Sequence, residues 1–340
     1  MKSAILLLAF AATAFAQNYT AKQITEQGVS IVRLTDASHG VEVSMMPSAG
    51  NRAYEMKVHG KNILYTAATD LAQYQRRPPL DGVPFLGPWG NRLTDAGFWA
   101  NGKRYQFNMT LGNVSRGQSS HGVLLTSPLW KVTEVSADAQ SAHVTSRLEF
   151  WKYPDLMAQW PFAHEYEMTY RLANGVLEVR TTVINLSTES MPIVVGFHPF
   201  YRIPDVPRDE WTAHVPARKA VIADAQLIPT GELKEMDLPD LFPLKDRTLD
   251  NGFTDLIRDA DGRAVFSIES GGKKVEVLFG RNYPVALVWE PAGRPFICFE
   301  PMAGITNAVN LNHDGKYPEL QTVAPGAKWT ESFWIRASGI

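Results

Sequence analysis

Cysteine is almost missing from this chain: Cys298 is the single thiol among 340 residues. One thiol excludes an intrachain disulfide and any zinc site built on cysteine ligands. Cys298 lies between Ile297 and Phe299 in an apolar run, with no activating charge beside it. We therefore expect it in the core rather than at a reactive site.

An excess of charge of one sign is also missing. The chain has 33 Lys and Arg against 35 Asp and Glu, a formal net charge of -2. Because nucleic-acid binding requires a basic surface, we expect no nucleic-acid partner. The common nucleotide and metal signatures, G-x-G-x-x-G, G-x-x-x-x-G-K-[ST] and H-E-x-x-H, are absent as well. We therefore expect no cofactor and no metal.

Beyond the first residues no apolar stretch approaches the 18 needed for a membrane span. The N-terminus has Lys2, the apolar run Ala4 to Ala12, and the small-x-small site Ala14-Phe15-Ala16 before polar Gln17. This pattern is typical of a signal peptide, because so short a run cannot cross about 30 Å of hydrocarbon. We predict cleavage after Ala16, a mature protein that is periplasmic or secreted, and no membrane association after cleavage.

Alternation of apolar and polar residues is what the chain has in abundance. From Phe162 to Leu172 every second residue is apolar or aromatic, and Leu177 to Ile184 repeats the pattern after Ala173-Asn174-Gly175, which predicts a β-hairpin. The only helix-like stretch is the short segment Asp70 to Gln75. With 25 Gly and 22 Pro between short strands, the sequence predicts an all-β fold. We expect one large antiparallel β-sandwich domain over residues 17–340. Further strands are predicted at Ser30 to Leu34, Val41 to Met45, Trp130 to Val135, Val144 to Phe150, Val265 to Ile268, Lys274 to Leu278, Val285 to Trp289 and Trp329 to Ile335.

Two of the eight histidines have unusual surroundings. His121 lies in a polar loop before Gly122, and His198 ends an apolar strand and is followed by Pro199. A histidine held by rigid backbone at a cleft suits proton transfer, although the pattern alone favours a structural role for each. His164, on the apolar face of its strand, is predicted to be a core histidine.

Glu300 ends the apolar strand Phe296 to Phe299. Burying a carboxylate there is costly unless it is paired or functional, and burial would raise its pKa toward that of a general base. Arg92 lies in a Gly and Pro loop beside Trp89, where a guanidinium and an indole could hold a sugar. Asp250 is compatible with a simple turn.

Five segments, taken in order, resemble the aldose 1-epimerase (galactose mutarotase) family over about Val29 to Ile335. They are Gly90-Asn91-Arg92-Leu93 with Gly97-Phe98 and Asn101-Gly102-Lys103, Ser120-His121-Gly122 with Trp130, Gly196-Phe197-His198-Pro199, Asp250-Asn251-Gly252-Phe253, and Cys298-Phe299-Glu300-Pro301 with Asn307-Ala308-Val309-Asn310. The resemblance implies a galactose mutarotase-like supersandwich and an isomerase that interconverts the α and β anomers of a free hexose.

The resemblance also implies the roles of individual residues. Glu300 would take the proton from the anomeric hydroxyl, and His198 would protonate the ring oxygen. The substrate-binding residues would be Arg92, Asn91 and His121 on the reacting end of the sugar, and Asp250 on distal hydroxyls. We expect charge attraction to dominate this pair, so that the acid limb of a pH profile reports the carboxylate and the alkaline limb the imidazole.

The chain departs from the family pattern at Val123, at Ser119 and in the strand Val285–Trp289, which lacks the glutamine that many members have. Other functions therefore stay open. They are a hexose-6-phosphate epimerase, a non-catalytic carbohydrate-binding sandwich, and a glycoside hydrolase or lyase that uses Asp250 and Glu300 as its carboxylate pair. The sequence leaves the preferred aldose and the oligomeric state undetermined.

Overall fold

A computed structural model describes residues 18–340 except 112, 113 and 116. The predicted signal peptide, residues 1–16, lies outside the described residues. Within them, no helix has the length and apolar character needed to cross a membrane.

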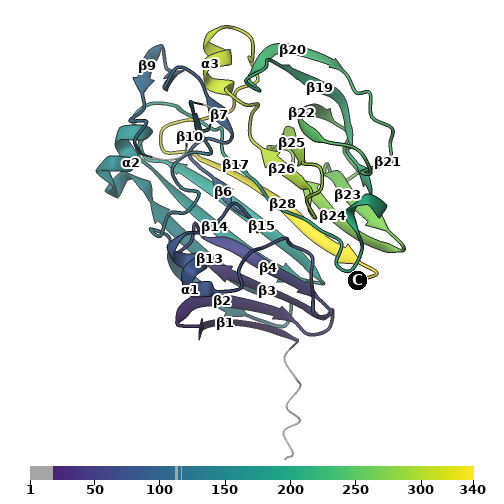
Figure 1. Cartoon of the computed structure of the whole chain (residues 1–340). Helices are drawn as coiled ribbons and strands as arrows, with labels where there is room; N and C mark the ends of the chain where they lie inside the picture. The colour runs from purple at the N-terminus through teal and green to yellow at the C-terminus, as the bar shows by residue number, and fades with distance from the viewer. Residues whose placement is uncertain (1–17, 112–113, 116) are drawn as a thin grey trace, which may run out of the picture.

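The largest sheet in the described part of the chain has nine antiparallel strands and forms the long central layer in Figure 1. In spatial order these are β12 (Lys131–Ala137), β13 (Ala142–Glu149), β14 (His164–Ala173), β15 (Val176–Asn185), β28 (Lys328–Ser338), β24 (Lys273–Phe279), β23 (Ala264–Ser270), β18 (Thr212–His214) and β21 (Phe242–Pro243).

Two further sheets face this central layer. One has seven strands, β20 (Pro229–Glu235), β19 (Ala217–Ala223), β22 (Leu249–Leu256), β25 (Val285–Glu290), β26 (Cys298–Met302), β17 (Gly196–Phe197) and β6 (Phe85–Leu86). The other has five, β1 (Tyr19–Glu26), β2 (Val29–Asp36), β3 (Val41–Met46), β4 (Arg52–Val58) and β5 (Lys61–Asn62). Aromatic pairs join the layers: Phe299 of β26 packs on Phe266 of β23, and Phe197 of β17 packs on Phe333 of β28.

Short elements complete the described chain. They are β7 (Arg92–Leu93), β8 (Gly97–Ala100), β9 (Lys103–Gln106), β10 (Val114–Ser115), β11 (Gln118–Ser120), β16 (Met191–Pro192), β27 (Thr322–Val323), the helices α1 (Leu71–Arg76), α2 (Pro154–Gln159) and α3 (Ala308–His313), and the 3-10 turns η1 (Phe150–Lys152) and η2 (Arg208–Glu210). The helix-like segment of the sequence is α1, which Asp70 caps by accepting a hydrogen bond from the Gln73 amide. The helices α2 and α3, of six residues each, were not predicted from the sequence.

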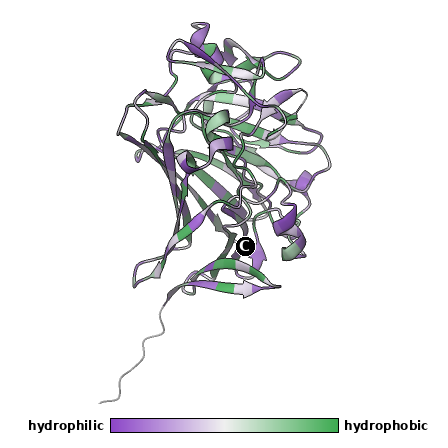
Figure 2. Ribbon diagram, turned by 90° about the vertical axis from the view of Figure 1, so that its left-hand side faces the viewer, coloured by the Kyte–Doolittle hydropathy of each residue, from purple (hydrophilic) through white to green (hydrophobic). Residues whose placement is uncertain are grey.

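The strand predictions are confirmed, and the fold is the predicted all-β antiparallel sandwich. Burial alternates along β14, and β14 pairs with β15 around Asn174 and Gly175. Both turn residues have positive φ, 51° and 72°, as a two-residue hairpin of this type requires. Figure 2 shows hydrophobic and hydrophilic stretches interspersed along the strands, which puts one face of each sheet in the interior.

Trp160 gives a test of this packing. The side chain is fully buried and stacks on Phe98 with ring centroids 4.1 Å apart. Trp160→Ala should lower the free energy of unfolding by about 3–5 kcal/mol, because it leaves a cavity in a close-packed region. Urea denaturation followed by circular dichroism measures the change.

Trp151 is the matched control, because it is the same residue type at 43% exposure. Trp151→Ala should cost less than about 1 kcal/mol. Equal losses in the two variants would contradict the packing described here.

Candidate active site

Sheet register brings Glu300 and His198 together. Gly196 of β17 pairs with Met302 of β26, so that the antiparallel register, continued by two residues, sets His198 opposite Glu300. His198 Nε2 lies 3.3 Å from Glu300 Oε1. The two residues are 5% and 2% exposed. The structure thus holds an imidazole and a carboxyl group in contact inside the protein.

The neighbouring strands add residues on the same face. Leu287 of β25 pairs with Glu300 on one side and with Gly252 of β22 on the other. Two residues along, Trp289 pairs with Asp250. Because side chains alternate along a strand, all of these point to the face that carries Glu300.

Aromatic rings surround His198. Phe200 stacks on the imidazole with ring centroids 4.8 Å apart, and Trp289 meets it edge-on at 5.5 Å. These rings exclude water from one side of the pair and fix the orientation of the imidazole.

Pairing of β7 with β11 brings in the second group of site residues. Ser120 pairs with Arg92, and the amide of His121 donates to the carbonyl of Asn91 over 2.8 Å. Arg92 Nη1 donates to Asn91 Oδ1 over 3.0 Å. The ring of His121 then lies 5.5 Å from that of His198. Gly122 permits this turn, because its φ is +63° and a Cβ would overlap the carbonyl oxygen of Gly87.

Asn307 and Asn310 hold the Arg92 segment from a distant part of the chain. The Asn307 amide donates to the carbonyl of Arg92 over 3.1 Å, and its side-chain oxygen accepts from the amide of Thr94. Asn310 Nδ2 donates to the carbonyl of Gly97. These asparagines are positioning residues, and only the family motif pointed to them in the sequence.

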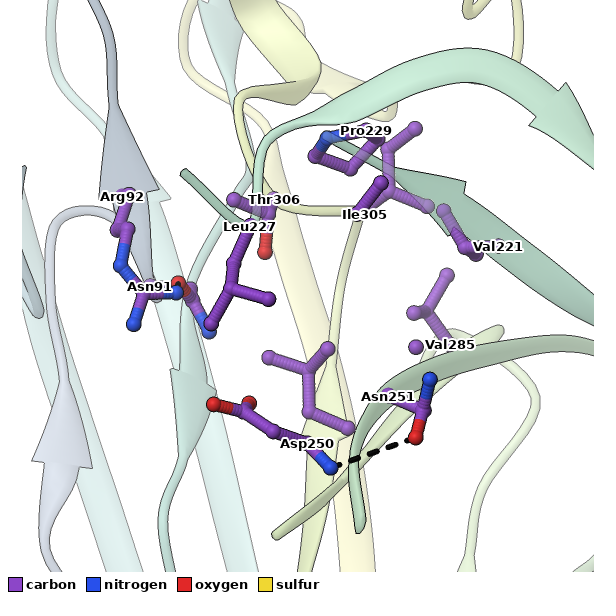
Figure 3. Close-up of a pocket in the computed structure, with 13 residues that line it drawn as sticks. Asn91, Arg92, Val221, Leu227, Pro229, Asp250, Asn251, Val285, Ile305 and Thr306 are labelled. Atoms are coloured by element: carbon purple, nitrogen blue, oxygen red, sulfur yellow. Dashed lines mark hydrogen bonds between the residues drawn. The ribbon is translucent and has the colours of Figure 1, made fainter. Parts of the chain in front are cut away.

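A pocket of about 130 Å³ opens beside the His198–Glu300 pair, and we call it the inner pocket. Figure 3 shows Asn91 and Arg92 on one side of it and Asp250 below. The lining residues are Asn91, Arg92, Val221, Ala223, Leu227, Pro229, Asp250, Asn251, Gly252, Val285, Leu287, Ile305 and Thr306. His121, His198 and Glu300 are not among them. Glu300 is next to the lining through Leu287, its cross-strand neighbour, and His121 follows Ser120, which pairs with Arg92.

Burial dominates the electrostatics of the site. It raises the pKa of Glu300 well above its usual range, Asp250 adds to the rise, and Arg92 opposes it. Burial also lowers the pKa of His198 well below its usual range, with His121 as a second cause. Both shifts favour the uncharged form of each group in the unliganded protein. Both directions oppose the expected dominance of charge attraction, which stays a prediction.

Three buried atoms of the site have no hydrogen-bond partner within the described part of the protein: Glu300 Oε2, His198 Nδ1 and His121 Nδ1. Leaving a buried polar atom without a partner costs about 1–3 kcal/mol. Hydroxyl groups of a bound ligand would satisfy such atoms. In the described residues no group of three or more His, Cys, Asp and Glu side chains is arranged to hold a metal ion.

The structure corrects one aromatic assignment. Trp89, considered beside Arg92 as a cover for a sugar, is fully buried and stacks on Phe107 at 4.4 Å. Trp289 is the tryptophan on the Glu300 face, and its alternation with Leu287 in the sequence was the signal that could have found it. Cys298 and His164 are core residues, as predicted, and His164 Nδ1 lies 2.6 Å from the carbonyl oxygen of Phe162.

The fold is a large antiparallel β-sandwich, and it holds a buried histidine and a buried glutamate in contact beside a pocket with one polar end. Together these features define a mutarotase-type supersandwich. The sequence profile of the aldose 1-epimerase family matches residues 30–336, and the chain belongs to that family.

Known proteins share the fold of this chain or part of its sequence. A galactose mutarotase-like protein from Clostridium acetobutylicum has the same fold, with a TM-score of 0.85, 22% identity, and coverage of 96% of this chain and 100% of that one. Galactose 1-epimerase from Lactobacillus acidophilus has a TM-score of 0.73 and 14% identity, with coverage of 95% of this chain and 99% of that one. The uncharacterized protein YihR of Escherichia coli is 27% identical over 157 residues, which is 45% of this chain and 47% of that protein. The matched segment thus spans about half the length of that curated relative.

His121 allows the electrostatic description to be tested directly. Burial, and secondarily Arg92, lowers its pKa to about 4. An NMR titration of the imidazole should therefore find His121 neutral at pH 7, and Arg92→Met should raise its pKa toward the ordinary value, because a neighbouring positive charge has been removed. An ordinary pKa for His121 in the unsubstituted protein would contradict this burial.

Proposed function

We propose that the protein is an aldose 1-epimerase that interconverts the α and β anomers of a neutral free hexose. The observation that carries the proposal is the 3.3 Å contact between His198 Nε2 and Glu300 Oε1 in a water-poor sheet beside the inner pocket. Family membership supports a sugar isomerase.

The chemistry of the pair fits ring opening. Mutarotation removes one proton from the anomeric hydroxyl, delivers one to the ring oxygen, allows the aldehyde to rotate, and then reverses both transfers. When Glu300 is protonated and His198 is neutral, the pair holds one proton that can move between the two groups. Its movement from Glu300 to His198 gives a carboxylate that accepts the hydroxyl proton and an imidazolium that donates to the ring oxygen.

The polar end of the inner pocket would bind the sugar near this pair. Arg92 and Asn91 present donors to the oxygens of the reacting end, and neutral His121 adds one donor and one acceptor. Asp250, at the opposite side of the polar end in Figure 3, would accept hydrogen bonds from distal hydroxyls.

The charge of the pocket favours a neutral sugar over a hexose 6-phosphate. Among its lining residues, all within the described chain, Arg92 is the one cation, and Asp250 offsets its charge. A phosphate carries nearly two negative charges and usually meets several cationic donors. We further propose that the protein is exported, on the strength of the N-terminal pattern before Gln17.

Removal of the base is the first functional test. Glu300→Gln keeps the shape of the side chain but cannot accept the hydroxyl proton, so kcat should fall by at least about 10²-fold. Polarimetry on fresh α-D-glucose and α-D-galactose measures the rate.

Glu134→Gln, at an exposed carboxyl group of β12, is the control and should keep the full rate. No acceleration of any common aldose by the unsubstituted protein would refute the proposed activity. Binding without turnover would then favour a non-catalytic sugar-binding protein, and release of reducing ends from a polysaccharide would favour a hydrolase.

The pH dependence should follow the shifts in the pair. Below the lowered pKa of His198 the pair gains a second proton and has no base, and above the raised pKa of Glu300 it has no proton to donate. A plot of kcat/KM against pH should therefore be a bell in which His198 sets the acid limb and Glu300 sets the alkaline limb.

The residual activity of two variants separates the limbs. Glu300→Gln should lose the alkaline limb, and His198→Asn should lose the acid limb, because neither new side chain titrates. If Glu300→Gln loses the acid limb instead, and His198→Asn the alkaline limb, the pair is ionic in the resting protein.

A further inference from the structure

The hairpin that joins β19 to β20 borders the inner pocket. Ala223, Leu227 and Pro229 of this hairpin are among the residues that line the pocket. All three are apolar, whereas Arg92 and Asp250 line the same pocket with charged groups. The hairpin therefore supplies carbon surface to a pocket that also holds polar groups.

A tight turn from Asp224 to Ile228 closes the hairpin. Asp224 Oδ1 accepts hydrogen bonds from the amides of Gln226 and Ile228, each over 2.9 Å. The Asp224 amide donates to the carbonyl of Ile228, and the Leu227 amide donates to the carbonyl of Asp224, both over 2.9 Å. These hydrogen bonds fix the backbone on both sides of Leu227.

Leu227 has a strained backbone conformation. Its φ is +62°, in the left-handed region that residues with a Cβ seldom adopt. The other non-glycine residues with positive φ in the described part of the chain are Asn, Asp, His, Gln or Ala. Three of them, Asn91, His121 and Asn307, belong to the candidate active site. Strained backbone thus gathers around this site, and Leu227 is the large aliphatic residue among its members.

The same turn recurs in this chain with a glycine in place of the leucine. Asp259 Oδ1 accepts from the amides of Asp261 and Arg263 over 3.0 and 2.8 Å. The Asp259 amide donates to the carbonyl of Arg263, and the Gly262 amide donates to the carbonyl of Asp259. Gly262, which occupies the place of Leu227, has a φ of +78°. The turn by itself therefore favours glycine and gives no reason for a leucine.

Packing in the core gives no reason for it either. Leu227 is partly buried, and it is not among the hydrophobic residues that pack against the core clusters of the described chain. Figure 3 shows its side chain directed into the inner pocket, above Asp250. The side chain is therefore available to a ligand in the pocket.

We propose that Leu227 is a substrate-binding residue that packs on the carbon face of the bound sugar ring. A pyranose presents C–H groups between its hydroxyls, and an aliphatic side chain covers such a face without competing for hydrogen bonds. Asp224 is the positioning residue that holds the leucine in place. The inference rests on the proposed function and adds a binding residue to it.

Truncation of the leucine tests the contact. Leu227→Ala should raise KM for α-D-glucose or α-D-galactose at least about fivefold and leave kcat within about twofold, because the leucine contacts the bound sugar and the transition state alike. Polarimetry on the fresh anomers measures both constants.

Leu227→Gly separates binding from stability. Its KM should rise as in Leu227→Ala, yet it should unfold at a higher urea concentration than Leu227→Ala, because glycine adopts this φ without strain. A leucine that only stabilised the turn would not give this combination.

Asp224→Ala tests the positioning role through a double-mutant cycle. It should raise KM in the otherwise unsubstituted protein and add little in the Leu227→Ala background, because Asp224 acts through Leu227. Asp259→Ala is the matched control, since it opens the same kind of turn at a residue outside the pocket lining. It should leave KM and kcat unchanged.

The outcomes separate this inference from the proposed function. Turnover with an unchanged or lower KM in Leu227→Ala overturns the inference and leaves the epimerase intact. Full additivity in the double-mutant cycle overturns the role of Asp224. If the unsubstituted protein turns over no sugar, the proposed function fails, and calorimetry with glucose and galactose decides the role of Leu227. Weaker binding by Leu227→Ala supports it, whereas equal binding, or no binding by the unsubstituted protein, overturns it.

Discussion

The burial of Glu300 against His198 is the constraint on which the rest of the site depends. A carboxyl group and an imidazole in contact at 3.3 Å inside an apolar sheet are costly as separate ions, so that burial shifts both pKa values toward the uncharged forms. Phe200 and Trp289 maintain that environment by covering the imidazole. Under the proposed function, the same burial prepares both groups to exchange protons with a sugar.

Two separate strand systems meet at this pair. The seven-stranded sheet supplies Glu300, Asp250 and Trp289 through the register of β22, β25 and β26. The β7–β11 pairing supplies Arg92 and His121, and Asn307 ties the Arg92 backbone down from the far end of the chain. Since each system is fixed by backbone hydrogen bonds, the charged side chains need few contacts of their own to stay in place.

Polarity changes along the pocket from the Arg92 end to the Val221 end. Asn91, Arg92 and Asp250 gather near the pair, whereas Val221, Pro229, Val285 and Ile305 form the opposite wall in Figure 3. An asymmetric pocket of this kind orients a ligand, because hydroxyl groups lose hydrogen bonds when they face the aliphatic side.

The sequence by itself determined the β-sandwich, because period-2 alternation and turn residues such as Asn174-Gly175 act over a few neighbours. It also identified Glu300 and His198 as the ends of apolar strands, and order along the chain pointed to the family. Only the tertiary structure decided that Trp289, and not Trp89, faces the site, since a tryptophan in a glycine-rich loop gives no sign of the layer it enters. The direction of the pKa shifts likewise came from the fold. The burial of a residue depends on neighbours from distant strands, and no local pattern in the sequence indicates how many of those neighbours are apolar.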